Sequence, residues 1–132
     1  MSGHYHAVVW IDHHEARILD FNAEEAGTTL VHPAHPPRHL HHKAGNPFGA
    51  SAAGEPGFYR DVAAAIGEAK EILVAGPSSA KTEFVKFLAK HMPPLLDRVR
   101  RIETLDKVSD GQLLAEARRF FAAEDRTLPQ RP

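Results

Sequence analysis

The stretch ILVAGPSSAKTEFVKFL, residues 72–88, places phosphate-binding residue types between an apolar run and a helical run. A nucleotide-binding P-loop needs a second glycine directly before its lysine, because its backbone amides must first curl around a phosphate. Here four residues separate Gly76 from Lys81, the second glycine is absent, and Pro77 removes one amide donor. The pattern therefore argues against nucleotide hydrolysis. It favours a helix start that holds one phosphate through Gly76, Ser78, Ser79 and Lys81, with an ordinary N-cap by Ser78 or Ser79 as the alternative.

A second candidate is the histidine-rich stretch HPAHPPRHLHHK, which begins at residue 32. His39 and His41 would share one side of an extended chain, as zinc ligands do. However, residues 26–54 contain no Asp or Glu, and Arg38 and Lys43 would repel a divalent ion. We therefore assign no metal site and expect contact with RNA or a protein partner through Arg38, His39, His41, His42 and Lys43. A surface loop without binding function is the alternative.

The stretch DHHE, residues 12–15, has the residue types of acid–base catalysis. It lies between two apolar runs, where a hairpin turn is expected. No serine or cysteine nucleophile accompanies it, so we predict a turn rather than a catalytic site.

Hydrophobic periodicity indicates which elements position these residues. Three strands are expected first, over 7–12, 17–21 and 28–32, and both faces of the first are largely apolar, which is typical of a strand covered on two sides. A long loop over 32–57 follows, with five Pro, four Gly and five His.

The second half of the chain alternates helices and strands. The expected elements are a helix over 58–69, a strand over 71–76, a helix that Pro93-Pro94 ends, a strand over 98–105, and a helix from Ser109 with a capping box to Gln112. In that last helix the apolar spacing predicts buried Leu113, Ala117 and Phe120, with Leu114 and Phe121 as further candidates. Alternation of strand and helix implies a parallel crossover, so we predict an α/β fold with a mixed sheet flanked by helices.

Composition limits what these motifs can mean. At 132 residues, 42% hydrophobic and 25% charged, the chain fits one globular domain, which we place at 1–125 with a tail over 126–132. The absence of cysteine excludes disulfides and thiolate chemistry, and no apolar run approaches the roughly 20 residues that span a bilayer. No signal-peptide pattern opens the sequence, so we expect a cytoplasmic protein.

The charge is nearly balanced overall, at −1, but it is uneven along the chain. Nine of the ten histidines lie within the first 42 residues. Residues 81–101 carry six Lys or Arg against two acidic residues, which predicts either a solvated helix face or a surface for a polyanion.

Four strings taken together resemble a known family: HYHAVVWIDHHEARILDF, HPPRHLHHKAG, ILVAGPSSAKTEF and IETLDKVSDGQLLAEARRFF. They are similar to a small bacterial family labelled translational machinery protein. That family is itself similar to the third domain of the eukaryotic and archaeal peptide-chain release factor and of pelota. The resemblance spans His4 to about Phe121. It implies an α/β/α sandwich of the kind shared with kink-turn-binding ribosomal proteins, and a role in translation.

The resemblance also limits the function. Release factors use a Gly-Gly-Gln loop in another domain, whereas here only Gly111-Gln112 occurs, preceded by Asp110 in a capping box. Peptide release is therefore not expected. In the multidomain relatives the third domain docks a translational GTPase, so a protein partner is as natural as RNA.

The leading hypothesis is a non-enzymatic module without a cofactor that engages the ribosome, tRNA, rRNA or a translation factor such as a GTPase. Its contacts would come from the histidine-rich loop and the basic helix start at Lys81. Two alternatives remain: a phosphate-binding enzyme, such as an RNA phosphodiesterase with histidine acid and base groups, and a histidine-based metal-binding protein. The oligomeric state is left open.

Overall fold

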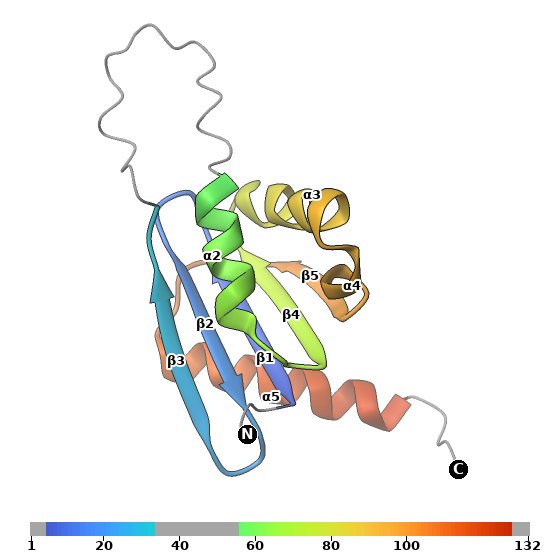
Figure 1. The fold of residues 1–132 in the computed structure, drawn as a ribbon. Coiled ribbons are helices and arrows are strands. Elements are labelled where there is room, and N and C mark those ends of the chain that lie inside the picture. The colour runs from blue at the N-terminus through green and yellow to red at the C-terminus, as the bar shows by residue number, and fades with distance from the viewer. Residues whose placement is uncertain (1–4, 34–55, 128–132) are drawn as a thin grey trace, which may run out of the picture.

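The computed structural model describes residues 5–33 and 56–127 of the chain, and it shows a five-stranded sheet with helices on both faces (Figure 1). The elements in chain order are β1 (His6–Ile11), β2 (Ala16–Phe21), β3 (Ala26–Val31), α2 (Pro56–Ile66), β4 (Glu71–Gly76), α3 (Ala80–His91), α4 (Pro93–Leu96), β5 (Val99–Thr104) and α5 (Asp110–Thr127).

The strand order is β3-β2-β1-β4-β5. The pairs β1–β2 and β2–β3 are antiparallel, and β1–β4 and β4–β5 are parallel. The predicted mixed sheet with a parallel crossover is therefore confirmed. The turn predicted at DHHE is also confirmed, because the Asp12 side-chain oxygen accepts hydrogen bonds from the amides of His14 (2.7 Å) and Glu15 (2.9 Å).

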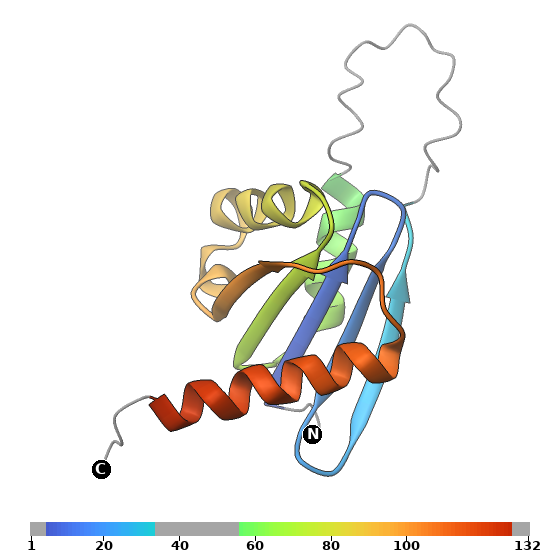
Figure 2. The ribbon, with the colours of Figure 1, turned by 180° about the vertical axis from the view of Figure 1, so that it is seen from behind.

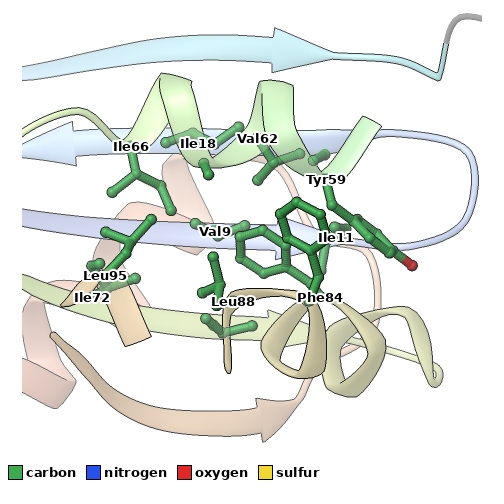
Figure 3. Packing of buried hydrophobic residues seen from close by; sticks show 14 of the residues in the cluster. Val9, Ile11, Ile18, Tyr59, Val62, Ile66, Ile72, Phe84, Leu88 and Leu95 are labelled. Atoms are coloured by element: carbon green, nitrogen blue, oxygen red, sulfur yellow. The ribbon is translucent and has the colours of Figure 1, made fainter. Parts of the chain in front are cut away.

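Two hydrophobic clusters cover the two sheet faces, as the apolar pattern of β1 predicts. Ala7, Val9 and Ile11 pack under α2, α3 and α4 in a cluster centred on Phe84 (Figure 3). Val8 and Trp10 lie on the opposite face, which α5 crosses (Figure 2). Helices thus cover both faces, and the architecture is the predicted α/β fold.

Differences from the expected elements occur at element ends. β3 begins at Ala26 rather than at residue 28. The first helix ends at Ile66 rather than at residue 69, because Gly67 adopts φ +65, outside the helical region. Pro93-Pro94 ends α3 as predicted, but Pro93 also begins the short α4, since proline is tolerated in the first helical turn.

The capping box of the last helix is confirmed. The Ser109 hydroxyl accepts a hydrogen bond from the Gln112 amide (3.1 Å), and the Gln112 side chain accepts one from the Ser109 amide (3.0 Å). Leu113, Ala117 and Phe121 are buried, whereas Phe120, which was expected in the core, is only partly buried. The phase of α5 therefore differs slightly from the predicted one.

Candidate functional site

The carboxyl ends of β1, β4 and β5 meet at one edge of the sheet, shown at the top of Figure 1, and α3 begins there. We call this the carboxyl edge. β3 also ends there and α2 begins there, so the flanks of the histidine-rich loop, Pro33 and Pro56, both lie at this edge (Figure 1). The candidate residues Arg38, His39, His41, His42 and Lys43 lie outside the described residues.

Gly76, the last residue of β4, is buried between neighbouring backbones. A Cβ atom at this position would collide with the carbonyl oxygen of Ile11 in β1. The Gly76 carbonyl also accepts a hydrogen bond from the Leu105 amide (2.9 Å). Close approach of two strands therefore explains this glycine, and its predicted part in phosphate binding stays a prediction.

Ser79 occupies the N-cap position of α3, but its hydroxyl makes no capping hydrogen bond. The alternative of an N-cap by Ser78 or Ser79 is therefore confirmed in position, but the cap forms no side-chain hydrogen bond, because the Ser79 hydroxyl lies 3.5 Å from a Glu83 carboxylate oxygen. Lys81 turns back over the loop and donates to the Ser78 carbonyl (2.7 Å). Ser78 and Ser79 are exposed, and Lys81 is half-buried. The helix start thus offers amides without a side-chain cap beside a lysine.

The Glu83 carboxylate joins three elements at this edge. One oxygen lies 3.3 Å from His13 Nε2, in the β1–β2 turn, and accepts a hydrogen bond from the Tyr59 hydroxyl of α2 (3.3 Å). Burial raises the pKa of Tyr59 above its usual range, and the charge and hydrogen bond of Glu83 raise it further, so the hydroxyl stays a donor. Glu83 was not among the site residues predicted from the sequence. Its position in the first turn of α3 was the available signal.

A second polar cluster lies on the α5 face of the same edge. Arg17 is 8% exposed, stacks over the Trp10 ring at 4.9 Å, and donates to Asp110 (2.6 Å) and the Val108 carbonyl (2.7 Å). Trp10 Nε1 donates to the Leu105 carbonyl (3.0 Å). These contacts fix the segment from β5 to α5, which the sequence pattern did not reveal.

The three arginines between Lys81 and Arg101 all contact a backbone carbonyl or a carboxylate. Arg98 donates to the Ala69 carbonyl (3.3 Å), Arg100 lies 3.8 Å from Glu124, and Arg101 lies 3.7 Å from Glu103. Acidic partners therefore offset the charges of Arg100 and Arg101, whereas Arg98 bonds to a neutral carbonyl and keeps its charge.

The remaining basic residues of α3 lie on two sides of the helix. Lys86 and Lys90 are exposed, four residues apart, and make no ion pair within the described part of the chain. Arg60 of α2 lies nearby over the Phe87 ring at 5.8 Å. Lys81 precedes Lys90 by nine residues, which is about 180° around a helix, so it is on the other side of α3.

The described ranges contain neither a metal-binding cluster nor a membrane-spanning helix. Within residues 5–33 and 56–127, no group of three or more His, Asp or Glu side chains could hold a metal ion. None of the described helices is long and apolar enough to cross a membrane.

Comparison with known proteins gives matches in structure only. No family model and no curated protein matches the sequence. Archaeoglobus fulgidus Pelota matches with a TM-score of 0.60 and 16% identity, over 86% of this chain and 30% of that one. The archaeal translation termination factor aRF1 matches with a TM-score of 0.59 and 17% identity, over 85% of this chain and 32% of that one.

Saccharomyces cerevisiae Dom34, a translation termination-like factor involved in RNA quality control pathways and interacting with Hbs1, matches with a TM-score of 0.54 and 11% identity. It is covered over 34% of its length, against 89% of this chain. The chain thus spans about a third of each matched structure. At these identities the likeness concerns the fold alone. Membership of the bacterial family stays a prediction, and the chain has a pelota-like α/β fold.

Proposed function

We propose that the chain is a non-enzymatic, translation-associated binding module that contacts ribosomal or transfer RNA with its carboxyl edge. One observation carries this proposal: Pro33 and Pro56 tether residues 34–55 at the same edge where α3 begins (Figure 1). The flanks of the segment that contains the predicted RNA contacts Arg38, His39, His41, His42 and Lys43 therefore lie at the edge that also carries Ser78, Ser79 and Lys81.

The charges at the α3 start favour an RNA backbone over a free nucleotide. Uncapped amides and Lys81 attract a phosphate, but the Glu83 carboxylate in the first turn opposes a second one. A single phosphate of a longer chain can approach from the Lys81 side, while histidine rings from the loop stack on bases. The fold shared with Pelota, aRF1 and Dom34 supports a role in translation.

Co-sedimentation with ribosomes across a salt series tests this function. Replacing His39, His41, His42 and Lys43 together by Ala should abolish the association, while Lys81→Ala should weaken it and lower the salt slope by about 0.9. Neither variant should change the free energy of unfolding by more than about 0.5 kcal/mol.

Lys70→Ala is the matched control, because Lys70 is exposed at the opposite, amino end of β4. It should bind like the unchanged chain. A salt-insensitive association, or equal losses in all three variants, would contradict the proposal. Capture of a translation factor from a ribosome-free fraction would assign the edge to a protein partner instead.

An RNA phosphodiesterase is the second candidate, because the structure brings His13 to Glu83 beside the α3 start. A carboxylate that holds one imidazole nitrogen lets the other accept or give a proton. Incubation of structured RNA with the chain and with His13→Ala, with and without chelator, tests it. Cleavage that His13→Ala removes would support the enzyme, and intact RNA would exclude it.

A further inference from the structure

The two edge strands of the sheet differ in how they are protected against pairing with another strand. β5 carries the adjacent exposed arginines Arg100 and Arg101, and charged side chains on an edge discourage pairing. β3, with the sequence AGTTLV, contains no charge and no proline and is mostly exposed. Leu30, at 52% exposure, is a large apolar side chain on this edge. Within residues 5–33 and 56–127, β3 therefore lacks the usual protection.

The hydrogen-bond pattern of β2 and β3 shows which backbone groups β3 leaves open. The Asn22 amide donates to the Glu25 carbonyl (3.0 Å) and closes the turn between the strands. Hydrogen-bonded pairs alternate along an antiparallel ladder, so the N–H and C=O groups of residues 27, 29 and 31 face β2. Those of Ala26, Thr28 and Leu30 face outward.

We propose that β3 pairs antiparallel with β3 of a second copy of this chain, around a two-fold axis at Thr28. In this register Thr28 faces Thr28 of the second copy, and Ala26 faces its Leu30. Every outward N–H and C=O group of residues 26, 28 and 30 then has a partner, which gives six hydrogen bonds. A register shift of one residue would place the outward N–H and C=O groups of one copy against residues whose groups face β2 in the other copy. A shift of two residues would leave some of the outward groups of residues 26, 28 and 30 without a partner in β3 of the second copy.

The side chains on one face of β3 are complementary to themselves in the same register. Residues two apart in a strand share a face, so Ala26, Thr28 and Leu30 lie along one line. Leu30 would cover Ala26 of the second copy. This self-complementary apolar contact favours a second copy over an unrelated strand.

Sedimentation equilibrium of the full chain tests the dimer. We expect a weak monomer–dimer equilibrium, with a dissociation constant on the order of micromolar or above, because two paired strands bury little area. Thr28→Lys places two ammonium groups opposite each other on the axis and should raise that constant about tenfold or more. Ile102→Lys, the matched change on the exposed β5 edge, should leave it within about twofold.

Thiol cross-linking tests the register, since the chain contains no native cysteine. Thr28→Cys should be linked readily by a short thiol-to-thiol reagent. Glu24→Cys should not be linked, because Glu24 lies in the turn before β3 and its two copies would be on the order of 20 Å apart. A chain that is monomeric at all concentrations overturns the proposal. A dimer that Ile102→Lys disrupts and Thr28→Lys does not would also overturn it, and equal linking at both positions would refute the register.

Discussion

Gly76 ends β4 at a point where the backbone of β1 leaves no room for a side chain. Gly76→Ala should therefore destabilise the chain by about 2–4 kcal/mol, because the obstructing atom belongs to a backbone carbonyl that cannot rotate away. Urea unfolding followed by circular dichroism measures the change.

Gly111→Ala is the matched control, since nothing lies within 4 Å of a Cβ at Gly111 in the first turn of α5. That change should stabilise the chain slightly, by about 0.5 kcal/mol. Equal losses at the two positions would contradict the steric explanation.

Gly76 also shows the limit of single-residue inference from the sequence. Its place before Ser78, Ser79 and Lys81 predicted a phosphate contact, but the need for glycine arises from the parallel pairing of β1 with β4. This pairing brings together Ile11 and Gly76, which are 65 positions apart in the sequence. A local motif therefore could not reveal it. The contact of His13 with Glu83 could not be predicted either, because these residues are also distant in the sequence.

At the scale of elements, β5 and α5 meet through a pair of carboxyl groups. Burial, followed by the charge of Glu116 and a hydrogen bond to it, raises the pKa of Glu103 above its usual range, while Arg101 and Arg119 act in the opposite direction. A raised pKa means that folding favours the protonated acid. The stability that this group contributes is thus present below the ordinary glutamate pKa and is lost as the pH rises through the raised value.

Glu103→Gln should therefore raise the free energy of unfolding at neutral pH, by up to about 1 kcal/mol, because glutamine stays neutral beside Glu116. The gain should vanish below about pH 4, where the glutamate itself is protonated. Urea unfolding at both pH values measures it. Glu68→Gln, at an exposed position, should change nothing at either pH, and a gain that persists in acid would rule out the electrostatic cause.

Most elements could be predicted from periodicity because each buries a face of regular spacing. The largely apolar β1 predicted cover on two sides, and Ser109 with Gln112 predicted the start of α5. Periodicity could not decide between Phe120 and Phe121. The contact of Arg17 with Asp110 anchors the start of α5, and Phe121 then faces the sheet.

At the scale of the whole molecule, the order of elements predicted a mixed sheet, but strand order in space decides what its edges can do. β3 and β5 become edges only because β4 pairs with β1 in parallel. The same pairing brings the starts of α2 and α3 together at the carboxyl edge. The histidine-rich stretch and the α3 start are about 40 residues apart in the sequence. The topology brings the flanks of the histidine-rich stretch to the edge where α3 begins.

Replacing residues 34–55 by a Gly/Ser linker of about ten residues tests how fold and function divide. Such a linker reaches roughly 17 Å, and loop length has only a weak effect on closure entropy. Since α2, α3 and α5 already cover both sheet faces, the free energy of unfolding should stay within about 1 kcal/mol of the unchanged chain. Ribosome co-sedimentation of the same variant should be lost.

The two measurements separate two propositions. Unfolding of the variant would mean that the segment belongs to the core, and the proposed division of the chain into a single domain with a long loop would be wrong. A folded variant that still co-sediments would leave the fold intact and move the contact away from the loop, to Lys86 and Lys90 of α3, whose double change to Ala would then abolish the association. Dimerisation through β3 should persist in the folded variant, because the edge from Ala26 to Val31 is unchanged.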